Sequence, residues 1–261
     1  MYTLDGINIT EFGAFAAVTK GERIALEGVF SFPKRKGSSE RNWYTEIEPF
    51  VETGDMEFDG RTLTLRAWIG GDTPVQYAGN LANFKNACIA CRTLATDYAS
   101  FAVILKESVK VDEYIGRNRA LVSAAFWEET VQFPELTATP SRGSGYLLDG
   151  YNLTTDFGIR VSERQDTNGV GKRLETDTTI PYTLTQYRDK GTATLKCYLR
   201  GDGFAELYDK MSRFHALCAS AGLRTLRFPD GAEMTGYVKE GFSAKAEHRT
   251  KIAFDFKLRL I

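Results

Sequence analysis

The sequence predicts an α+β protein that is mainly β, with two tandem similar β-sandwich or barrel domains that each carry one amphipathic α-helix. Three observations predict this class. The opening "MYTLDGINITEFG" returns past the middle of the chain as "GYLLDGYNLTTDFG", residues 145–158. An alternating strand pattern and a helical stripe of apolar residues also recur, both 130 positions later. Recurrence of three features in one order predicts a duplicated structural unit.

The first repeated element is the opening segment. Residues 2–6 align with 146–150 at an offset of 144, and Phe12-Gly13 meets Phe157-Gly158 after one inserted residue.

The second repeated element is a strand. "RTLTLRAWIGGD", residues 61–72, alternates apolar and polar side chains, the period of a strand with one buried face. "GTATLKCYLRGD", residues 191–202, repeats the alternation and also ends in Gly-Asp.

A helix follows each Gly-Asp. Apolar residues fall at spacings of four, three, four and three in both copies, which makes one stripe on a helix. They are Tyr77, Leu81, Phe84, Cys88 and Cys91 in the first copy and Leu207, Met211, Phe214, Cys218 and Ala221 in the second.

Each unit then ends in strands, "RALVSAAFWEE" in the first copy and "KIAFDFKLRLI" in the second. A lone amphipathic helix among antiparallel strands packs on the open face or end of a sandwich or small barrel. The short polar segment "TATPSRGSG" carries Pro140 and two glycines and is the natural linker. We therefore expect domains at 1–136 and 146–261, joined by the linker 137–145.

Composition excludes several classes of protein. The chain has 261 residues, a formal net charge of -1 and 43% apolar residues, which favours neither a nucleic-acid reader nor a membrane protein. Its start has no signal-peptide pattern, and its four cysteines are too few for a secreted disulfide scaffold. We expect a soluble protein that is made in a cytoplasm.

No residue pattern supports catalysis, a cofactor or a metal. His215 takes the place of Lys85 and is expected on a polar helix face, and His248 in a polar turn; neither has a nucleophile fixed beside it. Cys88 and Cys91 have redox or zinc spacing but belong to the apolar stripe, which favours core thiols. "NGVGKR", residues 168–173, fails the spacing of a phosphate loop. The sequence therefore predicts a protein that is not an enzyme.

The segment "LDGYNLTTDFG", the run "ATLKCYLRGDGFAELYDKMSRF" with its stripe at Met211 and Phe214, and "GLRTLRFPDG" together resemble the distal tail protein and tail-tube family of bacteriophages. The resemblance covers nearly the whole chain when it is applied twice. It implies a phage or prophage structural protein that forms a ring at the tail tip and joins the tail tube to the baseplate hub, with a central channel for DNA. Its location would be the virion tail, after assembly in the bacterial host cytoplasm.

Members of this family commonly pair one tube-like barrel with a second domain that resembles a carbohydrate module, and they assemble as hexamers. Here the second half resembles the first, which favours hubs with two tandem tube-like domains and three chains in a pseudo-sixfold ring. The partners implied are therefore other copies of the chain, as a trimer or hexamer, other tail and baseplate proteins, and DNA only as passing cargo.

Two charged loops differ most between the copies, 32–42 and 162–177. Both are expected to be long hairpin tips or mobile loops. We expect them to reach neighbouring subunits, with contacts through Lys34, Arg35, Lys36, Arg41, Lys172 and Arg173. The alternative is that they are solvated loops with no such contact.

A second function remains open, a carbohydrate-binding module that recognises a host surface at the tail tip. It needs exposed aromatic residues in a groove, for which Trp43, Tyr44, Trp68 and Trp127 are candidates. Trp68 falls on the polar face of its strand, which packing against a neighbouring domain explains equally well. A third reading, an enzyme of unrecognised type, needs a pocket that the sequence does not place.

Overall fold

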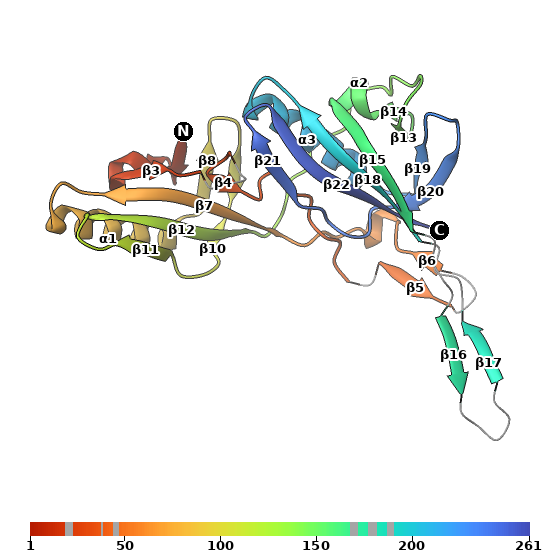
Figure 1. Ribbon diagram of the computed structural model, residues 1–261, viewed down its shortest axis with the longest axis horizontal. Helices are drawn as coiled ribbons and strands as arrows, with labels where there is room; N and C mark the ends of the chain where they lie inside the picture. Colours follow the sequence, from red (N-terminus) through yellow and green to blue (C-terminus); the bar gives the residue numbers. More distant parts are fainter. Residues whose placement is uncertain (19–22, 38, 44–46, 168–171, 177–181, 187–190) are drawn as a thin grey trace.

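The chain forms two β-rich units that lie side by side, each with one long helix (Figure 1). This computed structural model describes residues 1–18, 23–37, 39–43, 47–167, 172–176, 182–186 and 191–261. The first unit runs from β1 to β12 and the second from β13 to β22. Antiparallel strands dominate both units, which confirms the predicted α+β, mainly β class.

The elements of the first unit come in the following order along the chain. They are β1 (Tyr2–Leu4), β2 (Ile7–Asn8), the 3-10 helix η1 (Ile9–Phe12), β3 (Ala14–Ala16), β4 (Leu26–Glu27), β5 (Glu40–Asn42), β6 (Ile47–Pro49), the 3-10 helix η2 (Thr53–Asp55), β7 (Arg61–Gly70), α1 (Pro74–Ala90), β8 (Thr93–Thr96), β9 (Ser100–Ala102), β10 (Ile104–Leu105), β11 (Lys110–Tyr114) and β12 (Arg119–Glu128).

The second unit repeats much of this order. Its elements are β13 (Leu147–Leu148), β14 (Tyr151–Asn152), α2 (Leu153–Phe157), β15 (Ile159–Thr167), β16 (Lys172–Thr176), β17 (Tyr182–Gln186), β18 (Thr192–Arg200), α3 (Phe204–Ala219), β19 (Arg224–Arg227), β20 (Glu233–Tyr237), β21 (Ala244–His248) and β22 (Lys251–Leu260).

Most of the strand pairing corresponds between the two units, although the first unit divides into a four-stranded and a six-stranded sheet and the second has one eight-stranded sheet. In the first unit β1 pairs with β2 and β8, β8 with β9, and β7 with β3 and β12, while β10 and β11 pair with β12. In the second unit β13 pairs with β14 and β19, β19 with β20, and β18 with β15 and β22, while β20 and β21 pair with β22. The sequence repeat is therefore accompanied by a repeat of much of the strand pairing.

The opening turn is held in the same way in both units. Asp5 and Asp149 have positive φ angles of 48° and 51°, and each is followed by a glycine that also has a positive φ. The Asp5 carboxylate accepts a hydrogen bond from the backbone N–H of Thr93 at 2.7 Å, and the Asp149 carboxylate accepts one from Thr225 at 2.7 Å. A short acidic side chain tolerates this backbone conformation and bonds the neighbouring strand, which explains the repeated Leu-Asp-Gly.

The helix of each unit packs on the long strands that precede and follow it. Phe84 of α1 and Phe214 of α3 are completely buried, and so are the strand residues Leu65 and Leu195. Burying one such aromatic side chain contributes about 2 to 3 kcal/mol, so the predicted stripes account for much of each core.

The two units are joined by the chain between β3 and β7. Phe32 forms a β-bridge with Phe242 of the second unit, and both backbone hydrogen bonds of that bridge are present at 2.9 and 3.1 Å. Arg23 and Ser31 make further hydrogen bonds to Ala246 and Ala244. The expectation that 32–42 is a hairpin tip or mobile loop is wrong for its first part, because Phe32 and Arg35 are buried, whereas residues 40–42 do form one strand of the hairpin β5–β6.

The equivalent connection in the second unit lies between β15 and β18. It contains β16 and β17, which pair with each other antiparallel and project away from both units (Figure 1). Residues 162–167 of the predicted loop belong to β15 and 172–176 to β16, whereas 168–171 and 177 lie outside the described residues.

The predicted linker, residues 137–145, contains no helix or strand and lies against the second unit. Tyr151 donates a hydrogen bond to the Ala138 carbonyl at 2.7 Å, and the Ser141 hydroxyl donates one to Asp156 at 2.9 Å. The division of the chain at this segment stays a prediction.

Candidate functional site

A groove of about 720 Å³ lies at the end of β7, where the chain turns into α1. Its apolar wall is made by three aromatic side chains, Phe15 on β3, Trp68 on β7 and Tyr114 on β11, which are 62%, 39% and 48% exposed. The Trp68 and Tyr114 rings lie 5.3 Å apart. Exposed aromatic residues gathered at one concavity are typical of a binding site.

The floor of the groove depends on close packing between the strand end and the helix. A Cβ atom at Gly71 would lie 2.4 Å from the backbone nitrogen of Tyr77, so glycine is required at this position. Gln76 accepts a hydrogen bond from the backbone of Asp72, and Asn80 donates one to the carbonyl of Gly70 at 2.8 Å. These bonds fix the polar side of the groove.

The rim combines groups that donate and accept hydrogen bonds. Arg117 and Arg119 line the groove together with Asp72, Gln76 and Asn80. Aromatic faces bordered by planar polar groups suit a ligand that has both an apolar face and hydroxyl or anionic substituents. The arrangement supports binding.

The second unit has a hollow at the equivalent place with a different chemistry. It is lined by charged and polar residues: Arg200, Gly201, Asp202, Glu206, Lys210, His248, Thr250 and Lys251. Glu206 accepts the backbone hydrogen bond of Asp202, as Gln76 does for Asp72, and Lys210 replaces Asn80 as donor to the preceding strand. The hydrogen bond from Lys210 to Glu206 lowers the pKa of that carboxyl. The scaffold is thus repeated with a more charged lining, and Tyr198, the counterpart of Trp68, has its ring 5.3 Å from the guanidinium of Arg200 and from the ammonium of Lys251.

The four aromatic residues proposed from the sequence have different environments. Trp68 lies in the groove, as its place on the polar face indicated. Trp43 is exposed on a different part of the first unit and donates a hydrogen bond to Glu48. Trp127 is half-buried beneath the ammonium of Lys106, and Tyr44 lies outside the described residues. Phe15 and Tyr114 were missed, because neither stands out within a short strand pattern.

Several of the predicted contact residues already have partners within the chain. Lys34 lies 3.4 Å from Glu240, and Arg35 is buried beside the Tyr237 ring, so both contact the second unit. Lys36 reaches Glu57, and Arg41 lies over Trp43. The side chains of Lys172 and Arg173 lie outside the described residues, although their backbone is in β16. Contact of these six residues with another chain stays a prediction.

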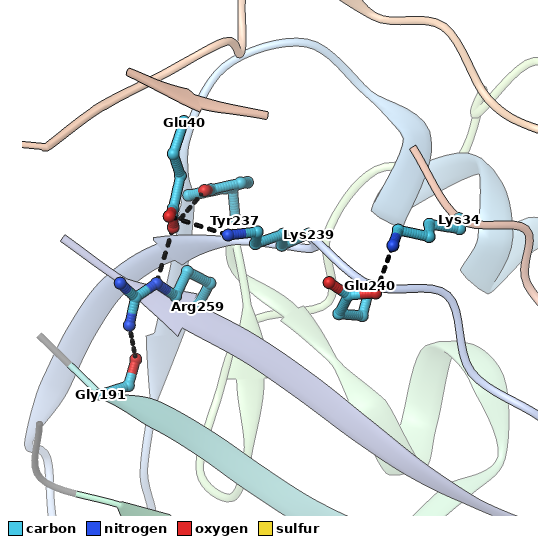
Figure 2. A network of polar contacts seen from close by, with 7 residues as sticks. All are labelled: Lys34, Glu40, Gly191, Tyr237, Lys239, Glu240 and Arg259. Atoms are coloured by element: carbon cyan, nitrogen blue, oxygen red, sulfur yellow. Dashed lines mark hydrogen bonds and ion pairs between the residues drawn. The ribbon is translucent and has the colours of Figure 1, made fainter. Parts of the chain in front are cut away.

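The strongest polar contact between the units centres on Glu40 of β5 (Figure 2). Its carboxylate accepts hydrogen bonds from the Tyr237 hydroxyl at 2.7 Å, the Lys239 ammonium at 2.8 Å and Arg259 Nε at 2.7 Å. Burial alone would raise the pKa of Glu40, but these three hydrogen bonds outweigh it and lower the pKa to about 2. Arg259 also donates to the Gly191 carbonyl at 3.1 Å, which ties the network to the start of β18.

The histidines and cysteines behave as structural groups. The expectation of a polar face for His215 is wrong, because the first unit covers this side of α3 and places the ring 5.2 Å from Phe32 and 5.5 Å from Phe242. Burial lowers the pKa of His215 well below its usual range. Burial together with Cys91 raises the pKa of Cys88 to about 12, and burial together with Asp5 raises that of Cys91 to about 11. Both thiols are core groups, as the stripe predicted.

Within the described ranges, no cluster of three or more histidine, cysteine, aspartate or glutamate residues could hold a metal ion. In the same ranges, no helix is both long and apolar enough to cross a membrane.

Comparisons with known proteins show a loose likeness to a solved structure. No family model matches the chain, and no curated protein matches it significantly. Among solved structures the chain is similar to the Dit protein (gp 19.1) of SPP1, described as a paradigm of the hub adsorption apparatus in phages that infect Gram-positive bacteria. The TM-score is 0.32 with 12% identity, over 98% of each chain. A likeness at this level defines no shared site.

Proposed function

We propose that this protein is a structural subunit of a phage or prophage tail tip, where it forms a ring between the tail tube and the baseplate. One observation carries the proposal: a single chain contains two units with largely corresponding strand pairing, the same opening turn and the same helix position. Two equivalent units in one chain halve the number of chains that a ring of such units needs.

The interface between the units supports this use of the duplication. In the first unit, the segment between β3 and β7 contacts the second unit. In the second unit, the hairpin β16–β17 lies in the equivalent segment and projects away from both units (Figure 1). A contact that runs from one unit to the next is heterologous, and heterologous contacts close into rings or extend into filaments.

The central channel, the passage of DNA and the location in the virion tail belong to the same proposal. The formal net charge of -1 agrees with a channel that does not retain DNA by counterion release.

The test is the assembled state of the purified full-length chain. Light scattering coupled to size exclusion should give a mass three or six times that of the 29.2 kDa chain, and negative-stain images should show rings with a central hole. A protein that stays monomeric at every concentration up to the millimolar range would contradict the proposal.

The aromatic groove of Phe15, Trp68 and Tyr114 favours a second candidate function, the recognition of a host-surface carbohydrate. All three aromatic residues are exposed, and the groove is also lined by carboxylate, amide and guanidinium groups that can bind hydroxyls.

This second candidate predicts binding on a glycan array by wild-type protein and loss of binding in Trp68→Ala. Trp43→Ala is the matched control, because Trp43 is an exposed tryptophan of the same unit outside the groove. Retained binding in Trp68→Ala, or no binding by the wild type, would remove this candidate.

A further inference from the structure

The outer faces of the two equivalent helices have different environments. On α3 this face is covered by the first unit: the Phe204 and Tyr208 rings each lie 6.4 Å from the Phe30 ring. Tyr208, Ser212 and His215 line a narrow gap with Val29 and Phe133, which closes this side of the helix. The covered face of α3 is therefore an interface within the chain.

The same positions on α1 face outward. At the offset of 130, Ala78 corresponds to Tyr208, Ala82 to Ser212 and Lys85 to His215. Ala78 and Ala82 are exposed, and Lys85 is half-buried. Two large apolar side chains of the same helix are also exposed, Val75 at 83% and Ile89 at 61%. This face presents small and apolar residues where α3 has an interface.

The strands beside the two helices show the same difference between a covered and an exposed position. In the second unit Tyr237 of β20 pairs with Arg259 of β22, and both bind Glu40 of the first unit. The matching ladder in the first unit pairs Ile104 of β10 with Trp127 of β12. Ile104 is the counterpart of Tyr237, which binds Glu40, and it is 48% exposed. The place equivalent to the Glu40 contact is therefore also uncovered in the first unit.

Lys239 and Glu240 have counterparts of the same type, Lys106 and Glu107, at one offset of 133. In the second unit Lys239 binds Glu40 and Glu240 binds Lys34, both across the interface. In the first unit Lys106 is exposed and lies over the Trp127 ring at 4.9 Å. The charged pair that the second unit uses for docking is thus retained in the first unit.

We propose that the α1–β10 surface, formed by the outer face of α1 with Ile104, Lys106 and Glu107, binds the second unit of another copy of this chain. The inference rests on the proposed ring. Within one chain the first unit contacts the second, and in the ring the second unit would contact the first unit of the next chain in the equivalent way. The duplication favours a second copy as the partner. Within one chain the first unit covers α3, and the second unit of another copy is the equivalent of that first unit. The α1–β10 surface keeps the equivalent helix face and the same Lys-Glu pair.

The experiment uses two variants of the full-length chain, each with one added negative charge on a different side of α1. Ala82→Glu adds it to the α1–β10 surface. Asn83→Glu is the matched control, because Asn83 is exposed on the same helix and its counterpart Arg213 pairs with Asp209 of α3 itself. Both positions are exposed, so both variants should keep the circular dichroism spectrum and melting temperature of the wild type.

Association is measured by sedimentation velocity over a concentration series. Ala82→Glu should raise the concentration needed for assembly by at least about tenfold, because an unpaired charge would be buried at the contact, whereas Asn83→Glu should assemble like the wild type. Loss of assembly in both variants, or in neither, overturns the inference and leaves the proposed ring standing. A wild-type protein that is itself monomeric overturns the proposed function instead.

Discussion

Replacing Glu40 by glutamine should weaken the junction between the two units. Glutamine keeps the shape of the side chain and one oxygen acceptor, but it removes the negative charge that faces Lys239 and Arg259. These two cations would then remain partly buried without the carboxylate that binds them. Breaking one side of such a network costs more than the pair contributes, because the desolvation of the remaining charges is no longer offset.

The magnitude follows from the lowered pKa. The pKa of Glu40 falls from 4.5 to about 2, which corresponds to roughly 3 kcal/mol of stabilisation at neutral pH. The side chain is 16% exposed, so solvent screens part of this interaction, and we expect a loss of about 2 kcal/mol in Glu40→Gln.

The sign of the pH dependence is also determined. Because the pKa is lower in the folded protein than in the unfolded chain, the contribution of Glu40 is fully present above about pH 4.5 and is lost as the pH falls toward 2. The free-energy difference between wild type and Glu40→Gln should therefore be largest near neutral pH and should shrink below pH 4.

The assay is denaturant unfolding of both proteins at several pH values between 7 and 3. Glu48→Gln serves as the control, because Glu48 is exposed on the partner strand of the same hairpin and should change stability by less than about 0.5 kcal/mol. A Glu40→Gln protein as stable as the wild type at pH 7, or a difference that does not change with pH, would refute the role assigned to this network.

Three further predictions concern single groups. Asn152→Ala removes the cap that accepts hydrogen bonds from two backbone N–H groups at the start of α2, so the free energy of unfolding should fall by about 1 kcal/mol; an unchanged denaturation midpoint would contradict it. The buried thiols of Cys88 and Cys91, whose pKa values are raised to about 12 and 11, should not react with a thiol reagent at pH 8 until the protein is unfolded, and fast labelling of the native protein would show that they are accessible. Because burial lowers the pKa of His215, the unfolded chain binds its proton first, and wild-type stability should fall as the pH drops below about 6.5. His215→Phe should reduce this dependence, and a variant whose stability falls with pH as steeply as that of the wild type would contradict it.

The spacing of apolar residues predicted the elements whose pattern lies within one continuous segment of the chain. The alternation in 61–70 and 192–200 gave long strands with one buried face, and the stripe through Phe84 and Phe214 gave the two helices. Local patterns succeed here because each of these elements buries its apolar side against its own unit.

Contacts between the units could not be predicted in this way. The segment 32–42 contains charged residues and turn formers and so looks like a surface loop, yet Phe32 and Arg35 are buried against the second unit. His215 was misassigned for the same reason, since its helix position is polar in the first unit and covered in the second. A pattern within one element contains no information on which other element will cover it.

The aromatic groove was only partly predictable. Trp68 was identified because an aromatic residue on the polar face of a strand has to be explained. Phe15 and Tyr114 come from two other strands, and only the ladder that sets β3 and β11 beside β7 and β12 brings them together. A site assembled from three strands requires the register of the sheet, which a single sequence does not provide.

The two units differ most where their surroundings differ. Equivalent positions on α1 and α3 hold Ala78 and Tyr208, and the large side chain occurs where a partner is present within the chain. The open face of α1 has nevertheless not become charged, as a permanently solvated helix face usually does: Lys85 is the single charged residue of α1, whereas α3 carries several. Divergence toward small and exposed residues, with Lys85 as the one charge of α1, favours a surface that is covered in the assembled protein, and that surface is the one where Ala82→Glu places its charge.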